Sequence, residues 1–187
     1  MSVTVISGVT GVGLSSVCQE TRRQLSDEYT LINFGDSMLE QAATAGITTD
    51  RDELSSLSRR EIRRLQRRAG EYVADMAEDR RVLLATHLTV STEAGFIGGL
   101  PDDVLSEVSP ERFVVLEAAP ETIVERRERS DRSVEVPSPR AIEFEQDLNR
   151  SAAFEYAREL NAPIQFVENE NDVEEAAEAV AGLLSSE

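Results

Sequence analysis

A glycine-spaced segment near the start of the chain contains the residues best suited to bind an anion. Gly8, Gly11 and Gly13 follow a run rich in β-branched residues and precede a segment of helical character. Glycine lets the backbone turn with few Cβ clashes, so successive amide groups and the helix N-terminus can converge on a phosphate. Gly8 and Gly13 have the spacing of the pattern G-x-x-x-x-G-K-[ST], in which Ser15 takes the hydroxyl position that reaches Mg²⁺. A glycine-rich turn without a ligand is the alternative, and the strand before and helix after the loop disfavour it.

Leu14 occupies the position of the lysine in that pattern. All nineteen basic residues are arginines, so the missing lysine belongs to the composition of the whole chain. Thirty-six acidic residues give a net charge of −17. An acidic surface without lysine suggests adaptation to concentrated salt, in which repulsion between like charges is screened.

Length and composition limit the class of protein. At 187 residues the chain can form one α/β domain with a real core and one mobile insertion. Its acidity argues against general binding of nucleic acid or of an anionic membrane. Cys18 is the only cysteine, which excludes an intrachain disulfide and a cysteine zinc cluster. No segment has the pattern of a membrane span or a signal peptide, so we expect a soluble cytoplasmic protein.

Apolar runs alternate with helical segments along the chain. The expected strands are the run before Gly8, Tyr29 to Phe34, Arg81 to Thr86, Phe113 to Glu117 and Ile164 to Val167. Helices between them predict the α/β class, with a doubly wound parallel sheet of about five strands covered by helices on both faces. Ligands of such sheets bind at the carboxyl ends of the strands.

The connecting segments are predicted from breakers and capping residues. The expected helices cover residues 17–25, 38–45, 58–76, 101–108, 120–129, 141–160 and 173–184. Asp36 or Ser37 is expected to cap the second of these helices. Gly95 to Pro101 predicts a loop, and Ser130 to Pro139 predicts an exposed excursion of the kind that forms a lid.

Arginine can supply the positive charge that phosphoryl transfer requires. Five arginines lie near the end of one helix, in the excursion and on the next helix: Arg126, Arg127, Arg129, Arg132 and Arg150. A guanidinium binds phosphate oxygens in a bidentate fork and stays charged, so this group can neutralise a transferring phosphoryl group when the excursion closes. Pairing with Glu125 and Glu128 on an exposed helix is the alternative.

A second arginine group lies on the helix expected from Ser58, whose hydroxyl and Glu61 have the spacing of a capping box. Its members are Arg59, Arg60, Arg63, Arg64, Arg67 and Arg68. Three interpretations stay open: a solvated face paired with acidic neighbours, a docking surface for another acidic subunit, and contact of one or two of these arginines with phosphate.

The chain resembles the archaeal-type adenylate kinases, a P-loop family distinct from the bacterial and eukaryotic type. The similar segments follow one another in a specific order over nearly the whole length. They are GVTGVG at Gly8 to Gly13, NFGDSM at Asn33 to Met38, DRDEL at Asp50 to Leu54, LQRRAGEYVADMA at Leu65 to Ala77, THLTVSTEAGFIGGLP at Thr86 to Pro101, VVLEAAPETIVERR at Val114 to Arg127, Asn149-Arg150 and Asn169 to Asn171. The resemblance implies a single P-loop NTPase-like domain over residues 1–187, with a nucleoside-monophosphate-binding insertion at about 36–80 and a lid at about 130–139.

The resemblance also implies Mg²⁺-dependent transfer of the terminal phosphoryl group of ATP to AMP, giving two ADP, by a protein that forms trimers. By this resemblance the donor phosphates are bound by Gly8, Val9, Thr10, Gly11, Val12, Gly13, Leu14, Ser15 and Ser16, the metal by Ser15, and the adenine by Asn169 and Asn171. The acceptor is bound by Gly35, Asp36, Met38, Thr86 and His87, and the transferring group by Arg126, Arg127, Arg132 and Arg150.

Some positions differ from the family's usual pattern. Leu14 replaces the loop lysine, Ser55 an arginine that clamps AMP, Ala85 an aspartate near the metal, and Val134 a second lid arginine. Arg51 is expected to replace the AMP-clamping arginine, and Asp36 or Glu117 the aspartate. Two alternatives stay open: a catalytically weak sensor or partner protein that binds adenine nucleotides, and a kinase for another small acceptor.

We predict that the melting temperature of the protein rises from dilute buffer to concentrated salt, because salt screens the repulsion within an acidic surface. Thermal unfolding followed by circular dichroism over a series of KCl concentrations measures the effect. Maximal stability in dilute buffer would contradict the salt hypothesis.

Overall fold

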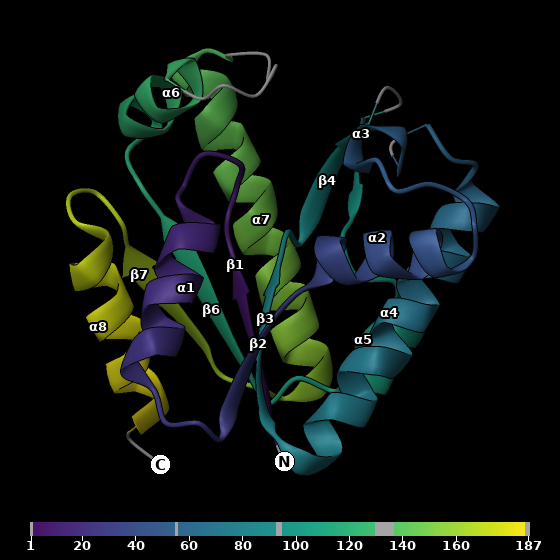
Figure 1. Ribbon diagram of the computed structural model, residues 1–187. Coiled ribbons are helices and arrows are strands. Elements are labelled where there is room, and N and C mark those ends of the chain that lie inside the picture. Colours follow the sequence, from purple (N-terminus) through teal and green to yellow (C-terminus); the bar gives the residue numbers. More distant parts are fainter. Residues whose placement is uncertain (1, 55, 93–94, 130–136, 186–187) are drawn as a thin grey trace.

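The computed structural model describes residues 2–54, 56–92, 95–129 and 137–185. Its centre is a five-stranded parallel sheet in the order β2-β3-β1-β6-β7 (Figure 1). The strands are β1 (Val3–Ser7), β2 (Tyr29–Asn33), β3 (Arg81–Thr86), β6 (Arg112–Glu117) and β7 (Ile164–Glu168). The predicted fold class is confirmed, and each predicted strand agrees with the structure to within about one residue, the uncertainty of such boundaries.

Helices cover both faces of the sheet (Figure 1). On one face lie α1 (Leu14–Gln24) and α8 (Val173–Ser185), and on the other lie α4 (Arg59–Asp79), α5 (Asp102–Val108) and α7 (Pro139–Leu160). Towards the carboxyl ends of the strands lie α2 (Phe34–Thr44), α3 (Arg51–Leu54) and α6 (Pro120–Glu128). The loops that meet at this edge of the sheet are therefore the ones able to form a site.

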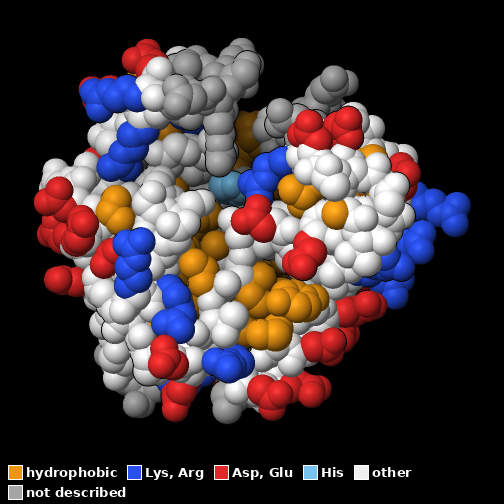
Figure 2. Space-filling model, viewed as in Figure 1, with side chains coloured by type: hydrophobic (Ala, Val, Ile, Leu, Met, Phe, Trp, Pro, Cys, Tyr) orange, Lys and Arg blue, Asp and Glu red, His pale blue; other side chains and the backbone are white. Residues whose placement is uncertain are grey.

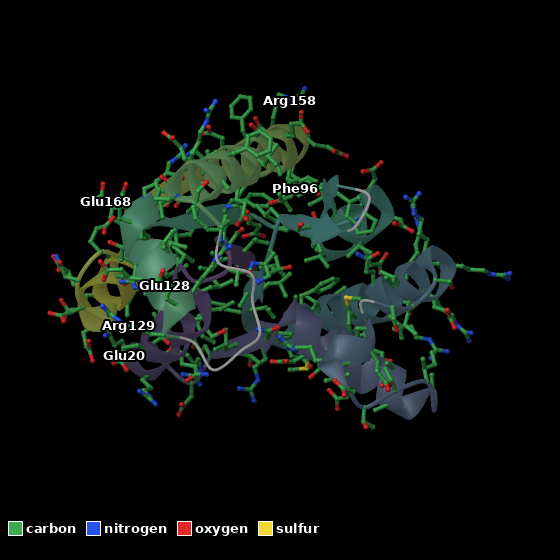
Figure 3. All side chains as sticks on the ribbon, turned by 90° about the horizontal axis from the view of Figure 1, so that it is seen from above. Glu20, Phe96, Glu128, Arg129, Arg158 and Glu168 are labelled. Carbon is green, nitrogen blue, oxygen red and sulfur yellow. The ribbon has the colours of Figure 1, made fainter. Side chains whose placement is uncertain are left out.

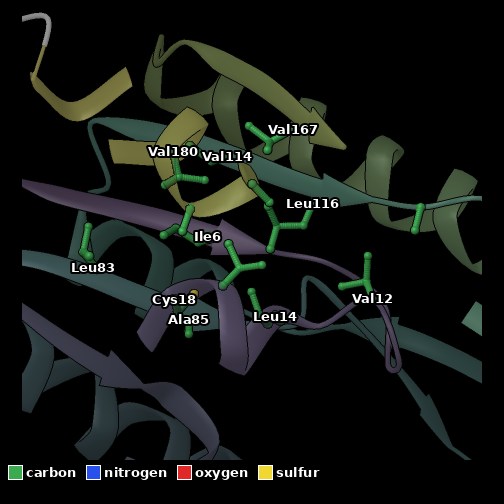
Figure 4. Packing of buried hydrophobic residues seen from close by; sticks show 14 of the residues in the cluster. Ile6, Val12, Leu14, Cys18, Leu83, Ala85, Val114, Leu116, Val167 and Val180 are labelled. Carbon is green, nitrogen blue, oxygen red and sulfur yellow. The ribbon is translucent and has the colours of Figure 1, made fainter. Parts of the chain in front are cut away.

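Two buried apolar layers hold the helices to the sheet. Along β1, Ile6 faces the layer under α1 and α8, while Val3 and Val5 face the layer under α4, α5 and α7. Alternation of this kind with both faces apolar is typical of a covered parallel sheet. Figure 4 shows the first layer, in which Cys18 packs beside the strands. Burial raises the pKa of the Cys18 thiol to about 12, so this cysteine stays protonated and acts as a packing residue.

Helix α2 begins four residues before the predicted Met38. Asn33 caps it, because its Oδ1 accepts a hydrogen bond from the Asp36 N–H at 3.1 Å. The prediction that Asp36 or Ser37 is the cap was therefore wrong. A cap requires extended backbone before the first turn, and Asn33 has that conformation as the last residue of β2.

The segment Gly95 to Pro101 is not the simple loop that the sequence predicted. An antiparallel hairpin forms from β4 (Thr89–Thr92) and β5 (Gly95–Gly98). Phe96 of β5 packs edge to face on Phe144 of α7, with ring centroids 6.0 Å apart, and Figure 3 shows Phe96 on the side of the hairpin towards α7. Flanking glycines hid the strand signal, and the aromatic contact packs the hairpin against α7.

The capping box at the start of α4 is confirmed. The Ser58 N–H donates to the Glu61 carboxylate at 3.0 Å, and the Glu61 N–H donates to the Ser58 hydroxyl at 3.4 Å. The hydrogen bond from the Ser58 hydroxyl is the main cause of a lowered pKa of Glu61.

The arginines of α4 form a basic edge on one lobe of the molecule (Figure 2). Arg63 and Arg67 lie 3.4 and 4.0 Å from the Asp103 carboxylate of α5. Within the part of the chain that the structure describes, no ion pair or hydrogen bond joins the side chains of the other members, Arg59, Arg60, Arg64 and Arg68, to a partner. The contacts thus pair Arg63 and Arg67 with an acidic neighbour, and the docking and phosphate-contact interpretations stay predictions.

In the same described ranges, no helix is both long and apolar enough to cross a bilayer.

We predict that Phe113→Ala lowers the free energy of unfolding by about 3–5 kcal/mol, because it leaves a cavity at a fully buried position of β6. Phe154→Ala is the matched control, since that ring is 60% exposed on α7, and it should change stability by no more than about 0.5 kcal/mol. Urea unfolding of both variants measures the difference. Equal losses would show that the assigned core is wrong.

Candidate active site

The loop from Gly8 to Gly13 connects β1 to α1 and needs glycine at particular positions. Gly11 and Gly13 have φ angles of +86° and +92°, a region that L side chains rarely adopt. At Gly8 an added Cβ would lie 2.6 Å from the Val12 side chain and 3.0 Å from the Leu116 carbonyl oxygen. The glycine spacing seen in the sequence is therefore required by the conformation of the loop.

Side chains from other segments hold the carbonyl groups of this loop from outside. His87 Nδ1 lies 2.7 Å from the Gly8 carbonyl oxygen, and Arg127 Nε donates to the Thr10 carbonyl oxygen at 2.9 Å. The Val12 carbonyl oxygen accepts from Asn169 Nδ2 at 2.7 Å and from Arg126 Nη1 at 3.2 Å. In a planar trans peptide the carbonyl and the next residue's N–H point in opposite directions. The N–H groups of Val9, Gly11 and Gly13 are thus turned away from these side chains, as an anion-binding loop requires.

Leu14 does not enter the loop. It is only 8% exposed and packs in the apolar layer with Val12, Cys18 and Ala85 (Figure 4). The position of the usual lysine is therefore filled by a core residue. The exposed residues of the first turn of α1 are Ser15 and Ser16, which lie at the positive end of the helix dipole.

A hollow of about 380 Å³ adjoins this turn. Among the residues that line it are Ser15, Asn33, Asp36 and Ala85, from α1, β2, α2 and β3. Magnesium prefers oxygen ligands, keeps several waters, and is commonly bound through one or two carboxylates plus substrate phosphates. In the described residues no three His, Cys, Asp or Glu side chains cluster to hold a metal by themselves. Ser15 and Asp36 thus carry oxygen atoms of the kind that Mg²⁺ prefers, and the Asp36 carboxylate is ion-paired with Arg51.

Of the residues predicted to bind the acceptor, Asp36 lines that hollow. Arg51 of α3 forms an ion pair with Asp36 of α2, and Gly35 lies beneath it, since an added Cβ would be 3.6 Å from Arg51 Nη2. His87 is exposed at the end of β3, and Figure 2 shows the only histidine in the depression between the two lobes. Thr86 beside it is buried.

Not every predicted residue reaches this depression directly. Met38 is partly buried and packs against the apolar layer of α4. Arg132 lies outside the described residues, as do Ser55 and Val134 and most of the predicted lid.

Arg150 is held by two carboxylates at the carboxyl end of β6. Its Nε and Nη2 donate to Glu117 at 2.5 and 3.3 Å, and its Nη1 donates to Asp147 at 2.5 Å. The hydrogen bond to Glu117 is the main cause of a raised pKa of Arg150, so its charge is fixed. Arg129 instead forms a surface ion pair with the Glu125 carboxylate at 3.0 Å. The alternative interpretation of the arginine group predicted this pairing with Glu125.

The turn after β7 packs against the loop. Asn169 is buried, its N–H donates to the Glu117 carbonyl at 2.8 Å, and its Oδ1 has no hydrogen-bond partner among the described residues. Asn171 is exposed. The structure thus brings the turn and the loop together, while the contact with adenine stays a prediction.

Sequence reasoning gave no role to two polar residues of α7 that support the site. Asn149 Oδ1 accepts a hydrogen bond from the buried Ser7 hydroxyl at 2.9 Å, and Gln146 bonds both the N–H and the carbonyl of Ala118. A signal was present: Gln146 and Asn149 lie in the same helical stripe as the buried Ile142 and Ala153. Polar residues in a buried stripe require partners.

Known proteins of similar sequence match nearly the full length of this chain. A family model described as an AAA domain matches residues 7–143. An adenylate kinase of Pyrococcus furiosus is 37% identical over 185 residues, covering 97% of this chain and 94% of the relative. One of Methanopyrus kandleri is 39% identical over 178 residues, covering 93% of each. The chain belongs to the adenylate kinase family.

Solved structures of similar fold include kinases of another kind. Shikimate kinases from Bacteroides thetaiotaomicron and Aquifex aeolicus align with TM-scores of 0.61 and 0.62, at 17% and 16% identity, over 98% of this chain. They cover 98% and 96% of those structures. At this identity the likeness shows the fold alone, so the adenylate kinase relationship depends on the sequence matches.

We predict that Gly13→Ala weakens ATP binding by at least about tenfold, because a residue with a Cβ strains the backbone by about 1–2 kcal/mol and displaces the loop. The added Cβ would lie 2.5 Å from Asn169 Nδ2. Gly182→Ala is the control, since nothing lies within 4 Å of its added Cβ on α8. Calorimetric titration with ATP measures both, and equal affinities would contradict the assigned loop.

Proposed function

We propose that this chain is a Mg²⁺-dependent nucleoside monophosphate kinase that transfers the terminal phosphoryl group of ATP to AMP, giving two ADP. Its membership in the adenylate kinase family supports this reaction. The observation that carries the proposal is the meeting, at one edge of the sheet, of an amide-presenting loop, the Ser15 hydroxyl and the fixed charge of Arg150. Such a site needs no strong base, because alignment of two phosphates and neutralisation of charge carry the reaction.

The proposed donor site is the loop and the first turn of α1. Residues 8–16 bind the phosphates of ATP, Ser15 contacts the Mg²⁺ that accompanies them, and the turn at Asn169 and Asn171 contacts the adenine. Mg²⁺ held by Ser15 would supply positive charge that offsets the negative charge of the phosphates. Support comes from the carbonyls of the loop, which are already bound from outside.

The proposed acceptor site adjoins the hollow at Asp36 and its ion-pair partner Arg51. AMP is bound by Gly35, Asp36, Arg51, Thr86 and His87, and the predicted Met38 supports them from the apolar layer. Arg51 is the cation of this group, and its ion pair with Asp36 is exposed enough to exchange for a phosphate.

Arg150 and, from the lid, Arg132 neutralise the transferring group in this proposal. Arg150 must release at least one donor from Glu117 or Asp147 to bind phosphate, and both contacts lie on a side chain that is 39% exposed. Arg126 and Arg127 add positive charge from behind the loop.

We also propose the domain organisation, the cellular location and the assembly of the protein. We place the nucleoside-monophosphate-binding insertion at about 36–80 and the lid at about 130–139 of a single domain, and we propose a cytoplasmic, salt-adapted homotrimer. The composition supports the salt adaptation.

A second candidate is a sensor that binds adenine nucleotides without fast turnover. The burial of Leu14 and the absence of a carboxylate at Ala85 favour it, because both positions remove charge that a kinase of this type would use. Tight ATP binding without ADP formation at any salt concentration would select this candidate over the kinase.

We predict that Arg150→Gln lowers kcat for ADP formation by about 10²–10³-fold, because it removes a charge aimed at the transition state. Phosphorus NMR of ATP, AMP and Mg²⁺ with the enzyme at low and high salt measures the rate. Arg158→Gln is the matched control on the same helix, since Arg158 is exposed and points away from the depression (Figure 3). A wild-type rate that Arg150→Gln leaves unchanged would contradict the assigned role.

A further inference from the structure

Glu145 of α7 forms a nearly buried ion pair that the predicted roles leave unexplained. Its carboxylate accepts hydrogen bonds from Arg127 Nη2 at 2.6 Å and Nη1 at 3.5 Å. The Arg127 side chain is 5% exposed and that of Glu145 is 20% exposed. A buried guanidinium needs such a partner, because an unpaired charge away from water is strongly unfavourable.

Arg127 in turn contacts two successive residues of the phosphate loop. Its Nε donates to the Thr10 carbonyl at 2.9 Å. Its Cγ lies where a side chain on Gly11 would have to go, 2.9 Å from an added Cβ. Glu145, Arg127 and Thr10 therefore form a continuous series of contacts from α7 to the loop.

We infer that Glu145 is a positioning residue for the donor phosphates. By fixing the Arg127 guanidinium, Glu145 fixes the Thr10 carbonyl, and the planar trans peptide then directs the Gly11 N–H to the opposite side. The inference rests on the proposed function, because it assigns to this pair the preparation of the ATP phosphate site. It also accounts for a loop that works without lysine: Arg127 supplies a cation whose place is set before ligand binds.

A purely structural ion pair makes a different prediction. It would change the stability of the fold and both nucleotide sites together. A positioning pair instead changes the loop amides and the binding of phosphate there, while the acceptor site on α2 and α3 keeps its affinity.

The test uses inorganic tripolyphosphate, which has no base or sugar and so reports on the phosphate site alone. In the full chain, Glu145→Ala should raise the tripolyphosphate Kd by about tenfold, in keeping with the large effect of misplaced groups in such sites. Glu145→Gln, which keeps the acceptor oxygen but loses the charge, should give a smaller increase. The matched control is Glu125→Gln, which breaks the surface pair with Arg129.

Two further measurements separate positioning from folding. In ¹⁵N NMR spectra of the ligand-free protein, the Gly11 amide resonance should move in Glu145→Ala and stay in place in Glu125→Gln. The KM for ATP should rise in Glu145→Ala, while the KM for AMP stays within about twofold.

Folded Glu145 variants with an unchanged tripolyphosphate Kd and an unmoved Gly11 resonance would overturn the inference, as would equal losses at the ATP and AMP sites. If Glu145→Ala does not fold, Glu145→Gln decides, because it has nearly the same size and still accepts from Arg127. A wild-type protein that binds tripolyphosphate but forms no ADP would overturn the proposed function. The tripolyphosphate Kd of the Glu145 variants would still test the inference.

Discussion

The site depends on hydrogen bonds that the first loop accepts through its carbonyl oxygens. The donors come from the end of β3, from α6 and from the turn after β7, so distant parts of the chain meet at one short segment. The strand order makes this possible, because β1 lies at the centre of the sheet with β3 and β6 as its neighbours. A backbone segment bound in this way presents its amides without help from an ammonium group.

Much of the fold could be predicted from the sequence because its strands are buried on both faces. Runs such as Val82 to Ala85 in β3 are continuously apolar, as a strand covered on both faces requires, and they appear where expected. The β4–β5 hairpin could not be predicted in the same way. It packs through Phe96 on Phe144, a contact between residues far apart in the sequence, and its flanking glycines indicate a turn. The start of α2 was missed because Asn33 serves as both strand end and cap.

The parts of the site that one short stretch of sequence specifies could be predicted. Glycine spacing and Ser15 identify the loop without any knowledge of its surroundings. Leu14 was read as a missing catalytic group, yet its side chain belongs to the core, which only the packing shows. Arg127 was expected at the phosphates and instead lies behind the loop with Glu145, because its burial depends on where α7 crosses α6. Sequence alone cannot give that crossing.

The use of arginine around the loop has a consequence for how the loop is connected to the rest of the fold. An ammonium is a point charge, whereas a guanidinium carries five N–H donors in a rigid planar fork. Arg126 bonds the Val12 carbonyl through one nitrogen and the Glu170 carbonyl through another, and Arg127 bonds the Thr10 carbonyl and the Glu145 carboxylate in the same way. Each guanidinium therefore cross-links the loop to a second segment of the chain, which a single-point cation would do less rigidly.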